Sequence, residues 1–549
     1  MTFSFLIIPL FIIFFYLSLK GLGYFFSQYL FKNNSTSLSL YPLISFPIIF
    51  FLLIVVHFFT KIYPFVNLLL LLIGLVLYFV KVKKNENLLL YLIILLVLSI
   101  QFYGHEVNED YGYYHLPYII NFVSDKLILG LSHLSMVQGY NSAWLNVSSF
   151  FYLPFFSEKS VHFANSVLFF SVLVFYIKFL FKKENLINFP ISSIYAIFAI
   201  TFFIIKNSRL NSFGIDVPGH IYASIVFFLF IYFFEKKDLS SRKFIFYLIS
   251  IFLIFCIVIK LSFISLILFP IICLFYERKI LDKKIFFVSL IFGISWVIQQ
   301  INYTSCIIFP IDFTCIKSLP WYSKNFINDA AFSLEYINKS YWNYEGSLAE
   351  HEYIKNFNWL STWFKRNLVE LTENIFTFIT PVILLIIYSF FIKTENKFFE
   401  IKKLLLVLFI PIIFGFLIWF LKAPVVRYGI FYLNTVLFLM FLLIFKHRLI
   451  NKLNRNFIFF ILILATSFNL IKNSIRIYNI ETYEDLPFPK MAKIIYETEK
   501  RNNLDLNTPI SQGNTQSTVC WNTPVYCRAG KFDNLNISKK NGYLIITPK

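Results

Sequence analysis

Long apolar runs, separated by short clusters of Lys and Arg, dominate this sequence. A helix needs about 20 mostly apolar residues to cross the hydrocarbon core of a bilayer, and only helices and closed barrels satisfy all their backbone hydrogen bonds there. Runs of roughly this length predict membrane-spanning helices. The predicted single spans lie near residues 2–19, 41–59, 62–80, 88–104, 161–181, 187–206, 220–234, 285–300, 373–392, 404–421, 425–445 and 457–472.

Composition supports the same class of protein. The chain is 58% hydrophobic and only 14% charged, with 73 Phe among 549 residues. A soluble fold of this size could not bury so much apolar surface. We therefore expect an all-α polytopic membrane protein.

A further apolar run, 244–276, is too long for one helix and contains Lys260 near its middle. The segments on both sides of it, "EKKDLSSRK" and "ERKILDKK", are rich in Lys and Arg and should face the cytoplasm. The run must then cross the membrane an even number of times. Two short helices with a turn at "KLS" satisfy this requirement and bring the prediction to about fourteen spans.

The net charge of +20 comes from scattered Lys and Arg clusters between apolar runs, which does not favour nucleic-acid binding. These clusters face the cytoplasm if the chain starts outside and alternates. Both termini are then extracytoplasmic. The predicted membrane domain covers 1–472 with outer loops 105–160 and 301–372, and an outer tail covers 473–549.

Two local patterns complete this topology. The N-terminus lacks a basic region and a small-residue cleavage site, so it is expected to be a first span and not a signal peptide. The apolar stretch "AWLNVSSFFYLPFF" within the first outer loop is short and contains Pro154. We expect it to lie along the membrane surface as an interfacial helix.

Four cysteines fall in the predicted outer regions. Cys306 and Cys315 share one loop, and Cys520 and Cys527 share the tail. Each pair is close enough in sequence to close a small ring in an oxidising compartment, with free thiols as the alternative.

The polar stretch "NEDYGYYHLPYI" follows directly on a predicted span. Its acids Glu109 and Asp110 would lie at the outer membrane surface. A partly desolvated carboxylate there could act as a general base on an incoming hydroxyl group. Asp110 is the favoured base, and Glu109 is either a second participant or a solvated neighbour.

Two cations lie at short turns on the same predicted face. Lys260 and Arg427 could together hold a lipid phosphate, since Arg offers a fork for phosphate oxygens and Lys a point charge. Asp216, in "GIDVPGH", adds an acid at the end of another span. The alternative is that these residues are anchors at helix ends or topology signals.

A metal site is the less favoured interpretation of the polar residues near the first outer loop. His115, His133 and Glu106 lack the close spacing of metal ligands. No cofactor is predicted, and a divalent metal is kept only as an alternative. The sequence also lacks a Gly-rich phosphate loop and a Gly-x-Ser-x-Gly elbow, which disfavours nucleotide hydrolysis and serine-hydrolase chemistry.

An early acidic motif, a later Lys within a helix pair and a late "APVVRY" turn occur in the order that resembles the GT-C superfamily of polytopic glycosyltransferases. Those enzymes use polyprenyl-phosphate-linked sugars. The stretch from Asp110 to Trp144 also resembles the first loop of an uncharacterised family of large bacterial membrane proteins. The matching residues are Asp110, Tyr114, His115, Gly130, Leu131, Asn141 and Ser142.

The resemblance to that family covers roughly residues 90 to 530. It continues through "IKLS" at Lys260, "CIIFPIDFTC" followed by Trp321, "WFLKAPVVRYG" around Arg427, and "CWNTPVYC" in the tail. The chain departs from the family pattern in two places. Ser135, Met136 and Val137 replace a His-Gly-Arg-like group, and Val425 replaces an acid. These departures bear on whether the acceptor or donor site is intact and on whether the protein is active.

The resemblance implies an inverting transfer at the outer face of the plasma (bacterial inner) membrane. Asp110 would take the proton of the acceptor hydroxyl, and basic residues would hold the departing lipid phosphate. The acceptor would be a glycan, lipid or protein. The residues expected to bind substrate are Tyr114, His115, Asn141, Asp216, Lys260, Arg427 and Tyr428.

Three other classes of protein remain as alternatives. A glycan polymerase should carry several Arg in its large outer loop, whereas 301–372 contains Arg366 alone. A transporter should show polar groups at mid-membrane and often an internal repeat, and no repeat is visible. A structural or sensory membrane protein is the third alternative.

Overall fold

The structure is a computed structural model of the chain. It describes residues 4–31, 38–83, 88–103, 110–207, 214–390, 401–449, 453–479, 494–502, 504–512, 515–516, 519–528 and 532–549.

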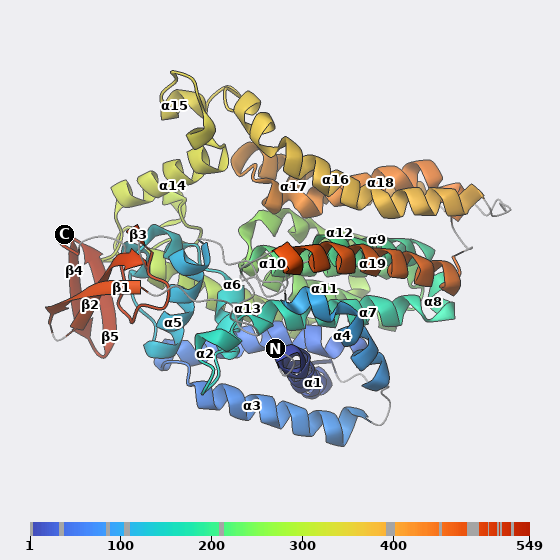
Figure 1. Cartoon of the computed structure of the whole chain (residues 1–549), viewed down its shortest axis with the longest axis horizontal. Coiled ribbons are helices and arrows are strands. Elements are labelled where there is room, and N and C mark those ends of the chain that lie inside the picture. Colours follow the sequence, from blue (N-terminus) through green and yellow to red (C-terminus); the bar gives the residue numbers. More distant parts are fainter. Residues whose placement is uncertain are drawn as a thin grey trace.

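Helices make up most of the described chain (Figure 1). The first half contains α1 (Ser4–Phe31), α2 (Tyr41–Phe59), α3 (Pro64–Leu77), α4 (Leu88–Tyr103), α5 (Leu116–Ser124), α6 (Ala143–Phe150), α7 (Phe163–Leu180), α8 (Lys183–Asn188), α9 (Pro190–Lys206) and α10 (Asp216–Glu235). The second half contains α11 (Leu239–Ile259), α12 (Leu268–Tyr276), α13 (Lys283–Thr304), α14 (Lys324–Asn338), α15 (Glu350–Tyr353), α16 (Leu360–Phe390), α17 (Ile401–Lys422), α18 (Val426–Leu449) and α19 (Arg455–Asn479).

Ten helices in the described ranges are long and apolar enough to cross a membrane. Four shorter apolar helical segments lie where the other predicted spans were expected: 88–101, 190–206, 261–276 and 407–422. The structure thus has the helical character of a multi-pass membrane protein.

The long run 244–276 is interrupted at Lys260, as its charge predicts. α11 ends at Ile259, and Lys260 is extended, with φ −153° and ψ 116°. The chain continues through a 3-10 turn, η8 (Leu261–Ile267), into α12. The first helix of the pair is longer than expected, because it begins at Leu239 and has 21 residues.

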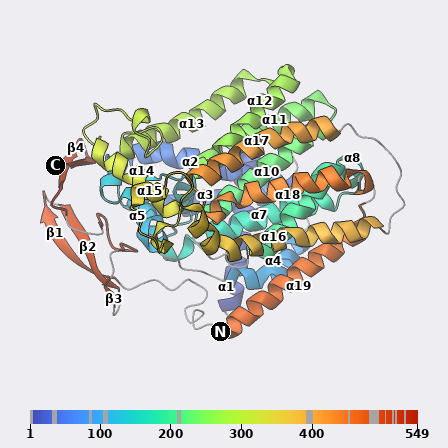
Figure 2. The same ribbon diagram turned by 90° about the horizontal axis from the view of Figure 1, so that it is seen from above.

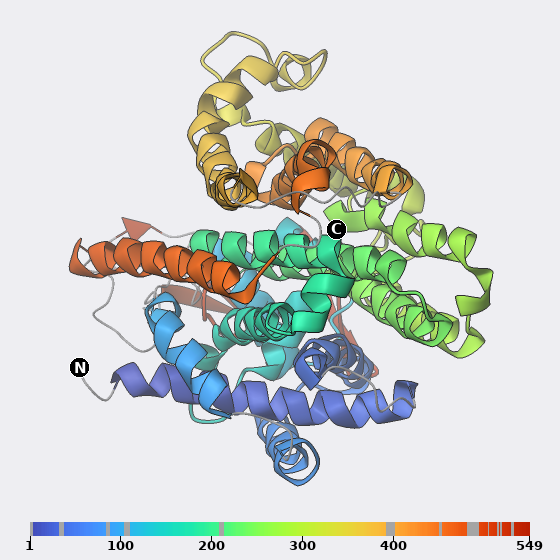
Figure 3. The same ribbon diagram turned by 90° about the vertical axis from the view of Figure 1, so that its right-hand side faces the viewer.

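Burial separates central helices from peripheral ones. In the span that contains α7, 89% of the residues of its most apolar 18-residue stretch are buried inside the protein. The corresponding shares for the spans that contain α3 and α16 are 28% and 22%. Figures 1 and 3 place α16, α17 and α18 on one side of the bundle and α1 and α3 on the other. The exposed side chains of α3, such as Phe65 and Leu69, are apolar, as expected for a surface that faces lipid.

Helices α1 and α3 approach each other very closely. A Cβ atom added at Gly21 would overlap the backbone carbonyl of Gly74, and one added at Gly74 would overlap the backbone carbonyl of Ser18. Small residues at such crossings let helix backbones pack tightly in membranes, where the hydrophobic effect does not drive association.

The expected interfacial helix is placed differently. Its sequence forms α6, but all eight residues from Ala143 to Phe150 are buried by protein. Phe46 of α2 lies against Trp144, with ring centroids 5.4 Å apart. The apolar character of this segment therefore reflects burial in the helical core, not contact with the membrane surface.

The C-terminal segment contains strands, which the all-α expectation did not include. An antiparallel sheet has the order β1-β2-β3, and a separate antiparallel pair joins β4 to β5. Figures 1 and 2 show these strands at one end of the bundle, which we call the strand end. The strands are β1 (Ile494–Arg501), β2 (Leu504–Gln512), β3 (Thr515–Gln516), β4 (Leu535–Lys540) and β5 (Tyr543–Pro548).

We predict that Gly21→Ala loosens the contact between α1 and α3. Overpacking at a tight helix crossing should lower the free energy of unfolding by about 1–3 kcal/mol. Thermal unfolding of the purified protein in detergent measures this loss. Gly293→Ala on α13 is the matched control, because its nearest new neighbour would be 4.0 Å away. Equal stability of both variants would refute the proposed role of the crossing.

Candidate active site

Four charged side chains from distant parts of the sequence meet at the strand end. Arg427 Nη2 lies 3.0 Å from Asp110 Oδ2, and Arg427 Nε lies 3.4 Å from Asp216 Oδ2. Lys260 Nζ donates a short hydrogen bond to Asp216 Oδ1. We call Asp110, Asp216, Lys260 and Arg427 the charge cluster.

The ends of secondary-structure elements bring these side chains together. Asp216 is the first residue of α10, and Arg427 is the second residue of α18. Lys260 lies at the break after α11, and Asp110 precedes the π-helical turn η4 (Tyr111–His115). The N-terminal ends of α10 and α18 carry positive partial charge, which adds to the two cations in favouring an anion.

Two tryptophans hold the turn that leads to Arg427. Trp363 of α16 donates a short hydrogen bond from its indole N–H to the carbonyl of Pro424. Trp419 of α17 donates to the carbonyl of Val425 at 2.7 Å. Because both carbonyls lie just before α18, these bonds fix where that helix starts and thus where Arg427 lies.

The turn at Lys260 is held in the same manner. Ser142 donates a hydrogen bond to the carbonyl of Ile259 at 2.8 Å. On the other side of Lys260, the Tyr432 hydroxyl of α18 donates to the carbonyl of Ser262 at 2.7 Å. The first loop and α18 therefore both position the lysine.

Tyr428 lies under the two cations. The Lys260 ammonium is 3.2 Å from the centroid of its ring, and the Arg427 guanidinium carbon is 5.4 Å from it. An aromatic face stabilises cations that have lost part of their hydration. The Lys260 side chain is only 11% exposed, so this support matters most for the lysine.

The two carboxylates of the charge cluster differ in how they are engaged. Asp216 contacts Lys260 through one oxygen and Arg427 through the other. Asp110 contacts Arg427 through Oδ2, and its side chain is one-third exposed. Asp110 is therefore better placed to meet an external proton donor, while Asp216 holds the cations.

Tyr114 and His115 of η4 lie beside the charge cluster. Their rings pack edge to face, with centroids 4.1 Å apart. Burial lowers the pKa of His115 to about 4 and raises the pKa of Tyr114, so both side chains are neutral at neutral pH. Neither ring nitrogen of His115 has a hydrogen-bond partner in the described structure. The neutral Tyr114 side chain and the neutral, unpaired His115 ring suit a neutral polar ligand such as a sugar.

Asn141 lies apart from this group, in a buried polar network. It accepts a hydrogen bond from Tyr118 at 2.6 Å and donates one to Gln299 at 3.0 Å. No contact with the charge cluster is recorded among the described residues. Its amide is used to join the first loop to α13. Glu109 and Glu106 lie outside the described residues.

Sequence reasoning missed His220, one turn along α10 from Asp216. Its Nε2 lies 2.6 Å from the carbonyl oxygen of Arg427, so it ties α10 to the start of α18. The spacing of four residues from Asp216 was the available signal, because it places both side chains on one helix face.

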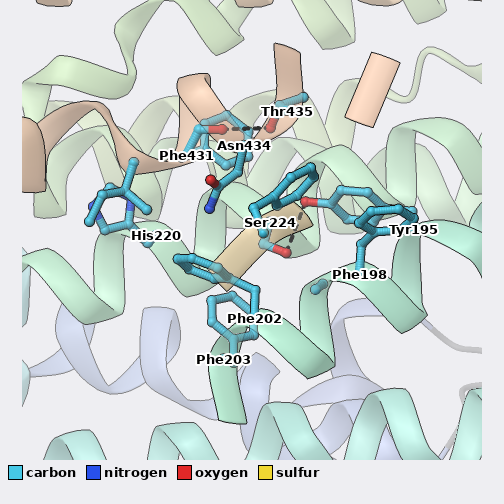
Figure 4. A pocket seen from close by; sticks show the side chains of 12 residues that line it. Tyr195, Phe198, Phe202, Phe203, His220, Ser224, Phe431, Asn434 and Thr435 are labelled. Carbon is cyan, nitrogen blue, oxygen red and sulfur yellow. Dashed lines mark hydrogen bonds between the residues drawn. The ribbon is translucent and has the colours of Figure 1, made fainter. Parts of the chain in front are cut away.

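An aromatic cavity lies one turn deeper between α9, α10, α16 and α18 (Figure 4). Its empty volume is about 370 Å³, part of which is open to the outside, and His220 is part of its wall. Figure 4 shows Ser224 and Asn434 beside the aromatic rings, with the Tyr195 hydroxyl donating to Ser224 at 3.0 Å. Five of the twelve residues that line it are phenylalanine.

Other predicted site residues are placed as follows. Two disulfides join Cys306 to Cys315 and Cys520 to Cys527. In the described ranges, no group of three or more His, Cys, Asp or Glu could hold a metal ion. His133 instead bonds the carbonyl of Trp321 at 2.9 Å, which fixes the first loop against the second.

We predict that Lys260→Met destabilises the protein by about 2–4 kcal/mol, because it leaves one oxygen of a largely buried carboxylate without its cation. Adding Asp216→Asn should recover part of this loss, which a double-mutant cycle of thermal unfolding would measure. Lys243→Met at the opposite end of α11 is the control. Its 3.1 Å pair with Asp282 is more exposed, and it should cost less than about 1 kcal/mol. Simple additivity at Lys260 and Asp216 would contradict the geometry.

Comparison with known proteins places the chain in a family. Residues 3–434, which include the whole charge cluster, match the family model described as "Domain of unknown function (DUF8201)". No curated protein sequence and no solved structure matches the chain. The match covers well over half of the chain, and this protein therefore belongs to the DUF8201 family.

Proposed function

We propose that this protein is a membrane glycosyltransferase. It transfers a sugar from a polyprenyl-phosphate-linked donor to an acceptor hydroxyl, with inversion at the anomeric carbon and Asp110 as the general base. The reaction takes place at the outer face of the plasma membrane, with fourteen spans and both termini outside. The meeting of Asp110, Asp216, Lys260 and Arg427 at one end of the bundle carries this proposal.

The charges of the cluster suit such a transfer. In the resting state the two carboxylates balance the two cations. When the acceptor oxygen bonds to the anomeric carbon, the bond to the phosphate oxygen breaks and the acceptor proton goes to Asp110. Protonation of Asp110 frees Arg427 from one of its two carboxylates as the leaving phosphate gains negative charge. The cations then interact more strongly with the transition state than with the donor, which is what catalysis requires.

The surroundings of the cluster match the two parts of the donor. The start of α18 lies beside the cations, and the phenylalanine-lined cavity follows one turn deeper along α10 and α18. A phosphate at Lys260 and Arg427 would place its isoprenoid chain along this apolar wall. Tyr114 and His115 lie near Asp110, where the sugar and the acceptor hydroxyl would meet.

We predict that Asp110→Asn blocks transfer but not folding. Loss of a general base should slow the reaction by about 10²–10⁴-fold. Cells that express Asp110→Asn at the wild-type level, and cells that carry a deletion, should both accumulate one lipid-linked sugar and lose one glycan modification. Mass spectrometry of the lipid pool and of the envelope glycans measures both changes.

Asp282→Asn is the control for this prediction. Asp282 is also a paired carboxylate, but it lies at the opposite end of the bundle. This variant should leave the lipid pool and the glycans unchanged. A deletion that alters the glycans while Asp110→Asn does not would remove Asp110 as the base. No change in either strain would remove the transferase proposal in favour of a transporter or an inactive homologue.

We predict that binding of polyprenyl phosphate weakens as the pH rises through about 8. Burial lowers the pKa of the Lys260 ammonium to about 8, so the charged form, which holds the phosphate, predominates below that pH and is lost above it. Equilibrium binding in detergent should weaken by about tenfold between pH values of about 7 and 9 if only charged Lys260 binds. Lys260→Arg keeps its charge and should remove this dependence. The same decline in Lys260→Arg would show that another group titrates.

A further inference from the structure

The disulfide loop of the C-terminal segment packs directly on the turn that follows Asp110. The backbone N–H of Trp521 donates a hydrogen bond to the carbonyl of Gly112 at 2.8 Å. The Trp521 ring meets the Tyr111 ring edge to face, with centroids 5.8 Å apart. Trp521 is only 6% exposed, although the sequence places it about 400 residues from this turn.

Gly112 permits this contact because it has no side chain. A Cβ atom at Gly112 would collide with three atoms of the Trp521 indole. The indole therefore lies against the backbone of η4 itself. Tyr111, Leu116, Ile119, Val161 and Trp521 together form a small buried cluster separate from the main core.

The turn that Trp521 covers needs outside support. η4 is a π-helical turn of five residues, and its hydrogen-bonding pattern is rare and occurs mostly as single turns, often at functional sites. Asp110 precedes it and makes no side-chain cap. The position of the Asp110 carboxylate against Arg427 thus depends on what holds the turn.

The disulfide loop is itself anchored at its other end. The Tyr526 hydroxyl donates a short hydrogen bond to the Asp125 carboxylate, just after α5. The backbone N–H of Asn507 in β2 donates to the carbonyl of Tyr526 at 2.8 Å. The loop closed by Cys520 and Cys527 therefore contacts both ends of the segment 110–125.

We propose that Trp521 is a positioning residue for Asp110. Held by the Cys520–Cys527 loop, it fixes η4 so that the Asp110 carboxylate stays against Arg427. Trp521 lies beyond the residues matched by the family model, so a segment outside the matched region completes the site. The effect on catalysis rests on the proposed transferase function, whereas the effect on the turn does not.

Amide hydrogen exchange of the full-length protein in detergent tests the proposal. Trp521→Ala should speed amide exchange across residues 110–119 by about tenfold or more. Local opening of this segment would cost less free energy, because it would no longer have to break the contact with Trp521. Trp521→Phe should restore much of the protection. Trp342→Ala, at a half-exposed tryptophan of another loop, should have no effect on this segment. Unchanged exchange at 110–119 in Trp521→Ala, with β4 and β5 still protected, would overturn the proposal.

A pair of substitutions separates positioning from general stabilisation. Gly112→Ala should loosen the turn in the wild-type background, where the new Cβ meets the indole. In the Trp521→Ala background it should add little, because the colliding atoms are gone. Additive effects of the two substitutions on exchange would contradict direct packing.

Reduction of the tail disulfide gives a second route if Trp521→Ala does not fold. In the variant Cys306→Ser with Cys315→Ser, a thiol reductant can open only the Cys520–Cys527 bridge, and exchange at 110–119 should rise. No rise after complete reduction would count against the loop as the support of the turn. If Trp521→Ala loosens the turn but the lipid-linked sugar pool is unchanged, the positioning stands and the transferase assignment fails.

Discussion

The sharing of Arg427 between two carboxylates is the contact on which the organisation of this protein depends. Asp110 and Arg427 are 317 residues apart in sequence, and Asp216 and Lys260 come from two further elements. Charges in partly buried positions must be paired, because an uncompensated ion costs several kcal/mol. Four elements therefore have to keep fixed positions relative to one another: the first loop, α10, the end of α11 and the start of α18.

The contacts around the charge cluster hold these elements in place. Trp363 and Trp419 fix the turn before Arg427, Ser142 and Tyr432 fix the turn at Lys260, and His220 joins α10 to α18. Of these hydrogen bonds, the one from His220 reaches the backbone of a charged residue itself, and the others reach residues one to three positions away in sequence. Support from a surrounding shell of this kind is typical of sites in which groups must be held in a fixed geometry.

The sequence predicted the helical framework well because apolar runs and charge clusters are local signals. The break at Lys260 followed from one charge in a long apolar run, and the helix ends that carry Asp216 and Arg427 followed from where such runs begin. The burial of α6 could not be predicted, because a short apolar segment looks the same on a membrane surface and in a protein core. The strands of the C-terminal segment were missed because β1 reads "IIYETEKR" and six of its eight residues are exposed, so no alternating apolar pattern marks it.

The meeting of the four charges was expected only in outline, as residues on one face. Sequence alone gave no pairing, and it could not show that Trp521 packs on the turn after Asp110 or that Asn141 belongs to a polar network with Tyr118 and Gln299. Those contacts join segments far apart in the chain. They depend on packing and not on local pattern.

Native mass spectrometry of the protein released from membranes of its own cells tests whether the charge cluster holds a lipid-linked phosphate. The wild type should carry a lipid that fragments to a polyprenyl phosphate bearing a sugar. Arg427→Gln should lose this lipid, whereas Asp110→Asn should retain it, because the base is needed for transfer and not for holding the phosphate. Absence of such a lipid from the wild type and Asp110→Asn, or its equal retention by Arg427→Gln, would show that the charge cluster does not bind a lipid-linked phosphate.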